Sequence, residues 1–159
     1  MRFAFVPLDD ARARAIAAWR YAGVYAFYDW ANDPDDLAEL LEPGNWGRAY
    51  HAALDRDGAL VGFLQATCAA GTVDIGLGLR PDLTGRGLGG PFLDACLTFV
   101  DGRFHPARFR LAVAAFNRRA ITVYERAGFR QVAEFEQRTN GGLHRFVRME
   151  RAATPDRSP

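Results

Sequence analysis

A glycine-rich loop at residues 80–90 is the first part of the sequence whose residue types and spacing could bind a ligand. It precedes an expected helix and contains four glycines, Gly85, Gly87, Gly89 and Gly90. Glycine lets the backbone approach an anion where a Cβ would interfere, and the first N–H groups of a helix have no partners inside it. The loop therefore predicts a diphosphate site built from backbone N–H groups, with a flexible glycine turn as the alternative.

A second candidate segment runs from residue 117 to residue 129. Asn117 can cap a helix, and Ala120 is small enough for another group to pass close to it. Tyr124 lies one turn beyond Ala120 on the same side, and Gly128 can end the helix. Taken by itself, Tyr124 is either a core aromatic residue or a proton donor at a site beside the helix.

The composition excludes several kinds of chemistry. All 20 basic residues are arginine, so no lysine can hold a phosphate, form a Schiff base or act as a general base. A formal net charge of +1 gives no overall field toward nucleic acid or an anionic membrane. Cys68 and Cys96 form no CxxC pair, and the three histidines, His51, His105 and His144, are widely spaced. We therefore expect no metal, no disulfide framework and no nucleic-acid partner.

The N-terminal residues and the apolar runs bear on location. The charged residues Arg2, Asp9 and Asp10 leave no apolar segment for a signal peptide. No apolar run approaches the roughly 20 residues of a membrane span. The sequence therefore predicts a cytoplasmic protein without a membrane partner.

The elements that must position the two segments form an alternating pattern, typical of one α/β (α+β) domain over residues 1–150 with a frayed tail at 151–159. Strands are expected at 2–7, 49–54, 60–69, 73–79, 109–114, 129–138 and 143–149, and helices at 11–21, 35–41, 89–101 and 118–126. The glycine loop follows antiparallel strands rather than a βαβ unit. A dinucleotide-binding oxidoreductase domain is therefore disfavoured.

The loop and the helix together resemble the GNAT superfamily of N-acetyltransferases. The family carries (Arg/Gln)-x-x-Gly-x-(Gly/Ala) before the first helix of this kind, and the sequence has TGRGLG at 84–89. The later family motif, Asn-x-x-Ala-x-x-x-Tyr-x-x-x-Gly-Phe, is matched throughout residues 117–129. Thr84 departs from the family's Arg or Gln; its hydroxyl could cap the helix and Arg86 could supply the charge. The resemblance covers residues 72–149 most clearly.

The resemblance implies an acyl-CoA N-acyltransferase fold, with a mixed, largely antiparallel sheet of about seven strands flanked by helices. It also implies that acetyl-CoA is the co-substrate, bound where the strands at 73–79 and 109–114 part. The residues that it places against the cofactor are Leu77, Gly78, Leu79, Thr84, Gly85, Arg86, Gly87, Leu88, Gly89, Gly90 and Asn117. Among the helix arginines, Arg119 is the candidate for the 3′-phosphate.

The implied reaction is direct attack of a primary amine on the thioester. Tyr124 would protonate the departing thiolate, and a backbone N–H near Gly78 or Leu79 would stabilise the oxyanion. An alkylamine has a pKa of about 10.4, so it must first lose a proton. Asp74 is the candidate base, acting through water, and a solvated carboxylate at a strand edge is the alternative for it.

The region between the first two strands is expected to face the acceptor. It is rich in aromatic residues, of which Tyr25, Tyr28 and Trp30 are candidate substrate contacts, and residues 29–42 carry acidic but no basic side chains. This suits a cationic or aromatic amine, whereas the alternative is a core with a solvated acidic helix. Small-molecule and peptide acceptors stay open, as does a homodimer. A GNAT-fold acyl-CoA sensor without turnover is the competing function, favoured by Thr84.

Overall fold

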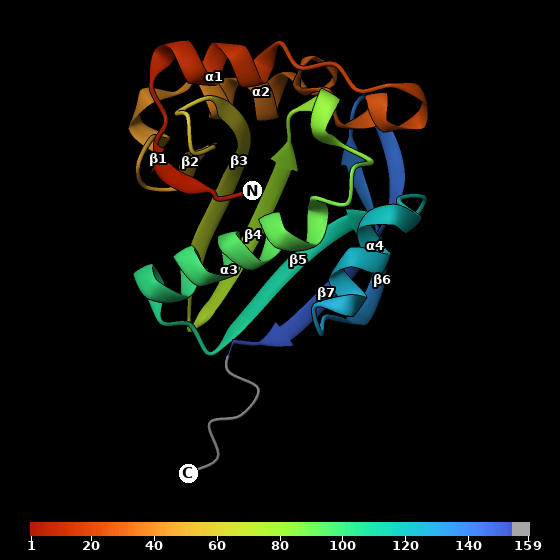
Figure 1. Ribbon diagram of the computed structural model, residues 1–159. Coiled ribbons are helices and arrows are strands. Elements are labelled where there is room, and N and C mark those ends of the chain that lie inside the picture. Colours follow the sequence, from red (N-terminus) through yellow and green to blue (C-terminus); the bar gives the residue numbers. More distant parts are fainter. Residues whose placement is uncertain (154–159) are drawn as a thin grey trace.

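The computed structural model describes residues 1–153, and a seven-stranded sheet runs through them (Figure 1). The strands lie in the order β1-β2-β3-β4-β5-β7-β6, and only β4 and β5 run parallel to each other. Their bounds are β1 Ala4–Pro7, β2 Tyr50–Leu54, β3 Leu60–Ala69, β4 Thr72–Leu79, β5 Arg108–Ala114, β6 Arg130–Thr139 and β7 Gly142–Ala152. The expected mixed, largely antiparallel sheet with flanking helices is thus confirmed.

Within residues 1–153, four α-helices and four short 3₁₀ helices surround the sheet. The α-helices are α1 Asp10–Ala17, α2 Pro34–Leu41, α3 Gly89–Phe104 and α4 Arg118–Arg126; the 3₁₀ helices are η1 Gly23–Tyr28, η2 Trp30–Asn32, η3 Pro43–Asn45 and η4 Pro81–Leu83. Figure 1 shows α3 and α4 in front of the sheet, with α1 and α2 along its upper end. Within residues 1–153, no helix has both the length and the apolar character needed to span a bilayer.

The two sets of helices bury separate cores. Phe92 and Cys96 of α3 pack against one set of strand residues, and Ile16 of α1 and Leu40 of α2 pack against another. Alternate residues of a strand point to opposite faces, and β2 contributes to both cores in this way. Ala52 joins the α1–α2 core and Ala53 joins the α3 core.

The strands β4 and β5 pair over only part of their length. Their pairing covers Thr72–Asp74 and Arg108–Arg110, and β5 then continues beside β7 as far as Ala114. The second half of β4 keeps its pairing to β3 but has no strand on its other side. An opening therefore begins between β4 and β5 after Asp74, where the family resemblance places the cofactor.

The largest differences from the predicted bounds lie at the ends of α1, α3 and β7. Helix α1 ends at Ala17 rather than near residue 21, and α3 continues to Phe104 before His105 adopts a left-handed φ of 47°. The predicted tail at 151 is wrong for its first residues: β7 continues to Ala152, which pairs with Arg108. The rest of the predicted tail, 154–159, lies outside the described residues.

Candidate active site

The backbone of β4 presents particular groups to the opening. The N–H of Arg80 donates to the carbonyl of Val61 at 2.8 Å, so Arg80 faces β3. Backbone groups alternate in direction along a strand, so Gly78 also faces β3, whereas Leu77 and Leu79 face the opening. Of the two predicted oxyanion donors, the N–H of Leu79 therefore points into the opening, whereas the N–H of Gly78 points toward β3.

A glycine in β4 and an aromatic ring in β3 lie in close contact beside the opening. A Cβ on Gly78 would come within 2.5 Å of Cε1 of Phe63, so only glycine fits there without moving the ring. The ring of Phe63 thus packs on Gly78, in the part of β4 that borders the opening. On its α1–α2 side, β4 is therefore covered by an apolar ring at this position.

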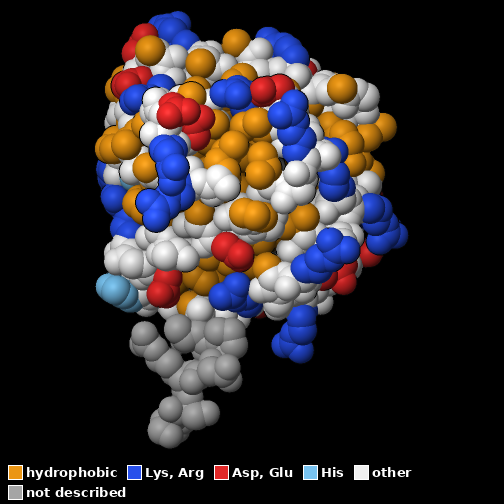
Figure 2. Space-filling view, in the orientation of Figure 1, with side chains coloured by type: hydrophobic (Ala, Val, Ile, Leu, Met, Phe, Trp, Pro, Cys, Tyr) orange, Lys and Arg blue, Asp and Glu red, His pale blue; other side chains and the backbone are white. Residues whose placement is uncertain are grey.

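The glycine loop leads into α3 without a side-chain cap. Gly85 and Gly87 have φ values of 74° and 76°, a left-handed conformation that favours glycine. Leu88 is the N-cap residue of α3 and offers no side-chain hydrogen bond, so the N–H groups of Gly89 and Gly90 can turn to a ligand. Figure 2 shows apolar side chains gathered at the centre of this face with arginines around them.

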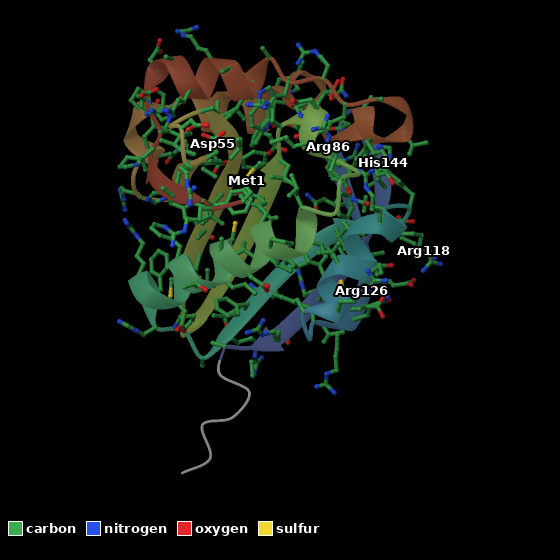
Figure 3. All side chains as sticks on the ribbon, viewed as in Figure 1. Met1, Asp55, Arg86, Arg118, Arg126 and His144 are labelled. Carbon is green, nitrogen blue, oxygen red and sulfur yellow. The ribbon has the colours of Figure 1, made fainter. Side chains whose placement is uncertain are left out.

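Thr84 does not take the role that the sequence suggested for it. Its hydroxyl donates to the carbonyl of Pro81 at 2.7 Å and closes the short turn of η4. The expectation that Thr84 caps the helix is therefore wrong, because the helix begins five residues later in the chain than Thr84. Arg86 is exposed and extends from the loop (Figure 3), whereas Arg118 points outward from α4.

The start of α4 places an asparagine between the helix and the aromatic segment. Oδ1 of Asn117 accepts from the N–H of Ala120 at 3.1 Å, which confirms the predicted cap. Nδ2 of Asn117 donates to the hydroxyl of Tyr28 at 3.0 Å, and Asn117 is only 9% exposed. A single buried amide thus joins the cofactor motif to residues of the predicted acceptor side.

Tyr124 lies two turns along α4 from Asn117 and on the same side of the helix. Its ring packs edge-on against Phe129, with centroids 5.9 Å apart. Burial, with smaller contributions from Tyr28 and Cys96, raises the pKa of the Tyr124 hydroxyl above its usual value of 10.0. The group therefore stays protonated at neutral pH, as a proton donor requires.

Arg119 lies between the loop and the aromatic segment. Its guanidinium carbon is 4.1 Å from the ring centroid of Tyr25, a cation–π contact, and a Cβ on Gly85 would lie 3.5 Å from its Nη1. A cavity of about 690 Å³ opens here, lined by Tyr21 and Tyr25 on one side and by Thr84 and Arg119 on the other. A guanidinium in this cavity can meet a phosphate close to the glycine loop.

Two tyrosines of the predicted acceptor side contact opposite walls of the opening. The hydroxyl of Tyr21 donates to the carbonyl of Leu79 at 2.8 Å, on the β4 wall. The hydroxyl of Tyr28 lies at Asn117, on the other wall. Tyr25, by its contact with Arg119, lies between these positions and the loop. Tyr25 and Tyr28 thus lie at the opening, and their contact with substrate stays a prediction.

Trp30 has a different environment from the two tyrosines. Its ring packs against Phe63 at a centroid distance of 5.3 Å and against Tyr50 at 6.4 Å, and it is partly buried against the core beneath α1 and α2. These contacts agree with the alternative of a core aromatic that the sequence left open. The contact of Trp30 with substrate stays a prediction.

The turn between β6 and β7 holds the aromatic segment from outside, a role that the sequence did not reveal. Oδ2 of Asp33 accepts from the Thr139 hydroxyl at 2.7 Å, and Nδ2 of Asn140 donates to the carbonyl of Phe27 at 2.7 Å. The Thr139 bond is the largest cause of the lowered pKa of Asp33. The sequence showed only an Asn-Gly turn here, and this pattern does not indicate which residues the turn contacts. We call residues 21–33 with this turn the acceptor wall.

The acidic residues at the start of the predicted acidic stretch serve the fold. Asp33 caps α2 through the N–H groups of Asp35 and Asp36, in addition to its bond with Thr139. Oδ1 of Asp29 accepts from the N–H of Tyr21 at 2.8 Å. These two carboxylates therefore organise the acceptor wall.

Asp74 is engaged by an arginine of the neighbouring strand. Its two carboxylate oxygens accept from Nε and Nη2 of Arg110 at 2.6 and 2.8 Å. Both residues lie where β4 and β5 are still paired, before the opening begins. Asp74 thus joins the two strands through this ion pair. Within residues 1–153, no group of three or more His, Cys, Asp or Glu side chains is arranged to hold a metal ion.

Comparisons with known proteins agree with this geometry. The family model described as "Acetyltransferase (GNAT) domain" matches residues 2–130. Mycothiol acetyltransferase of Streptomyces coelicolor is 40% identical over 136 residues, which are 79% of this chain but only 41% of that protein. The chain therefore spans less than half the length of this relative.

Solved structures show the same fold at low sequence identity. A spermidine N-acetyltransferase SpeG chimera from Vibrio cholerae and hSSAT superposes with a TM-score of 0.78 at 19% identity, covering 96% of each chain. Spermidine N-acetyltransferase from Vibrio cholerae in complex with CoA and spermine gives 0.76 at 19% identity, covering 95% of each chain. By its sequence match and its fold, this chain belongs to the GNAT acetyltransferase family.

Proposed function

We propose that this chain is an acetyl-CoA-dependent N-acetyltransferase that acts on a primary amine in a ternary complex. The observation that carries the proposal is the opening between β4 and β5, which places backbone groups of β4 opposite the buried Asn117 and beside Tyr124. A relative's name specifies an acetyltransferase, and the solved relatives include one with bound CoA. The acceptor is a small-molecule or peptide amine.

In this proposal the pantetheine arm of acetyl-CoA lies along β4 as an added strand, using the backbone groups of Leu77 and Leu79. The N–H groups of residues 85–90 receive the diphosphate, because the loop turns through two left-handed glycines and α3 starts without a side-chain cap. Asn117 has one N–H left for the cofactor after its bond to Tyr28. Arg119 provides the guanidinium for the 3′-phosphate.

The chemistry uses few protein groups. The amine nitrogen attacks the thioester carbonyl, the C–N bond forms, and the C–S bond breaks. The N–H of Leu79 stabilises the oxyanion, and Tyr124 gives its proton to the departing thiolate. The nitrogen, which is positively charged after the attack, releases one proton to solvent, and Tyr124 regains a proton from solvent. Because Asp74 is held by Arg110, the amine loses its proton to solvent, and the largely apolar, aromatic opening favours its neutral form.

This route has a definite pH dependence. The fraction of neutral amine increases up to the amine's own pKa, about 10.4 for an alkylamine, so the rate should increase with pH over the neutral and mildly alkaline range. The acid form of Tyr124 persists above pH 10.0, since its pKa is raised. We therefore expect no alkaline decline below about pH 10; a decline near pH 8 would contradict Tyr124 as the acid.

The alternative is a GNAT-fold protein that senses acyl-CoA without turnover. It is favoured by Thr84, which stands where the family carries Arg or Gln and which here bonds only to its own turn. The combination of Asn117 as a cap and Tyr124 with a raised pKa supports retained chemistry instead.

A two-step experiment tests the proposal. Thermal unfolding with acetyl-CoA and with NAD first separates the classes of cofactor, because a ligand of the folded state raises Tm. Thiol release from acetyl-CoA is then measured across a panel of amines that includes spermidine. Stabilisation by acetyl-CoA without thiol release would favour the sensor, and no stabilisation would contradict both readings.

A further inference from the structure

The hydroxyl of Tyr28 accepts a hydrogen bond and keeps its own proton to donate. Its oxygen accepts from Nδ2 of Asn117 at 3.0 Å. Burial raises the pKa of the Tyr28 hydroxyl, and the bond from Asn117 acts against this rise. A phenol oxygen has two acceptor positions and one O–H donor. Among the hydrogen bonds of the described residues, none uses the O–H of Tyr28 as donor, so its proton remains for a ligand.

The backbone of β5 shows where this hydroxyl lies. The N–H of Ala115 donates to the carbonyl of Arg145 on β7 at 3.0 Å. By strand alternation, the backbone groups of the preceding residue, Ala114, face away from β7 and toward the opening. The N–H of Asn117 donates to the carbonyl of Ala114 at 2.9 Å, and Nδ2 of Asn117 donates to the oxygen of Tyr28. The hydroxyl of Tyr28 therefore lies on the β5 wall of the opening.

The pairing register of β4 and β5 indicates which residues of β4 lie opposite this hydroxyl. Asp74 of β4 is paired with Arg110 of β5, and continuing both strands by the same number of residues brings Gly78 level with Ala114. Tyr28 therefore lies across the opening from the cleft-facing backbone of Leu77 and Leu79. The N–H of Leu79 on β4 and the O–H of Tyr28 are thus two donors on opposite sides of the opening.

Tyr124 adds a second tyrosine to the same region. It projects from α4 on the side of Asn117, and long helical side chains slant back toward the helix N-terminus, here toward Asn117 and its partner Tyr28. The effect of Tyr28 on the pKa of Tyr124 agrees with this nearness. The two tyrosines come from different walls, one from the acceptor wall and one from α4.

We propose that Tyr28 recognises the acyl group: its O–H donates a hydrogen bond to the carbonyl oxygen of the acetyl thioester, while Tyr124 gives its proton to the sulfur. This deepens the proposed function and rests on it. During attack the carbonyl oxygen takes the electron pair of the C=O π bond, and Tyr28 with the N–H of Leu79 stabilises that charge without transferring a proton. When the C=O bond re-forms, the C–S bond breaks and Tyr124 supplies the proton to sulfur.

The bond from Asn117 favours Tyr28 as a donor to the substrate. An N–H on its oxygen polarises the O–H bond and strengthens Tyr28 as a hydrogen-bond donor. Tyr21, the other hydroxyl at the opening, already donates to the carbonyl of Leu79 at 2.8 Å. Tyr21 is therefore a matched comparison: a phenol from the same segment, at the same opening, whose proton is committed to the backbone.

The test compares the Kd of acetyl-CoA with that of CoA, which lacks the acyl carbonyl. In Tyr28→Phe, we expect the preference for acetyl-CoA over CoA to fall about three- to tenfold, the effect of one hydrogen bond, with the Kd of CoA unchanged. Tyr21→Phe should keep the wild-type preference. An unchanged preference in Tyr28→Phe, or an equal loss in Tyr21→Phe, would overturn the assignment.

A second variant covers the case in which Tyr28→Phe fails to fold. Asn117→Asp keeps a side-chain oxygen to cap α4 but turns the amide donor into an acceptor, which should capture the Tyr28 proton. Its preference for acetyl-CoA should fall similarly, since any contact with pantetheine is common to both ligands and cancels in the ratio. A wild-type preference in Asn117→Asp would also count against the assignment.

Turnover distinguishes this inference from the proposed function. With spermidine, tyramine and glycinamide as probe amines, loss of an oxyanion donor in Tyr28→Phe should lower kcat about 10²- to 10³-fold. A wild type that binds neither CoA nor acetyl-CoA contradicts the proposed function. A wild type that binds and turns over, but binds acetyl-CoA no better than CoA, contradicts the role of Tyr28 alone.

Discussion

The two sides of the opening are built by different kinds of contact. On the cofactor side, which comprises the loop at 84–90 and α4, the bonds are local: Thr84 bonds to Pro81, and Asn117 caps the helix at Ala120. On the acceptor wall the bonds join distant parts of the chain: Tyr21 bonds to Leu79, Asp33 to Thr139 and Asn140 to Phe27, and Tyr28 to Asn117.

This difference explains why one side carries a readable motif and the other does not. A local loop and helix need particular residues at fixed spacing, so glycines, a cap and a tyrosine appear as a pattern. A wall held by long-range bonds can use any residue that reaches its partner. Substitutions at Tyr124, Gly85 and Asp33 test this contrast, because each should affect one side and spare the other. A substitution at Asp74, which lies outside both sides, should affect neither.

The largest effect is expected for Tyr124→Phe. Removing the acid should lower kcat about 10²- to 10⁴-fold, while the fold keeps the same ring packed on Phe129. The Kd of acetyl-CoA should hardly change, because the hydroxyl acts only when the thiolate departs. Steady-state kinetics with isothermal titration checks both quantities, and an unchanged kcat would remove Tyr124 as the acid.

Gly85→Ala should act on cofactor binding. An alanine at a φ of 74° is strained by about 1–2 kcal/mol, so the loop should lose its conformation and the Kd of acetyl-CoA should rise about tenfold. Gly58→Ala is the matched control, since Gly58 has a φ of 82° in the β2–β3 hairpin turn. If both variants bind acetyl-CoA equally well, the loop does not hold the diphosphate.

Asp33→Ala should act on the acceptor wall. It removes the cap of α2 and the bond to Thr139, and loss of a cap costs about 1 kcal/mol. We expect a lower Tm and a higher KM for the amine, with the Kd of acetyl-CoA unchanged. Asp33→Asn can still cap the helix, so it should lose less stability; a weaker binding of acetyl-CoA would contradict the separation of the two sides.

The same carboxylate gives the acceptor wall a pH dependence. The pKa of Asp33 is lowered in the folded state, chiefly by the Thr139 bond. Its contribution to stability is therefore present above the unfolded value of 3.8 and is lost as the pH falls through the lower folded pKa. Asp33→Asn should flatten this part of a Tm-against-pH curve.

The smallest effect is expected for Asp74→Asn. The pair with Arg110 is about half exposed, with side-chain exposures of 46% and 36%, so its loss should cost at most about 1 kcal/mol. We expect the pH profile of kcat to keep its wild-type shape. A profile whose acidic limb moves would restore Asp74 as the general base.

The sequence by itself determined the elements with strong local signals. The bounds of β3 and α4 agree with the predictions, because a turn or a cap marks each end: Gly58 precedes β3, and Asn117 and Gly128 flank α4. The glycine loop and its position before α3 were also readable, since left-handed turns favour glycine. These features depend on residues near one another in the chain.

Only the tertiary structure decided which side chains face the opening. Asp74 and Trp30 had suitable chemistry at suitable positions in the sequence. In the structure Asp74 pairs with Arg110, and Trp30 packs against Phe63 and Tyr50. Tyr28 and the turn at 139–140 gained their contacts from segments far along the chain. Such bonds depend on where the sheet brings distant residues together, which residue type and spacing do not encode.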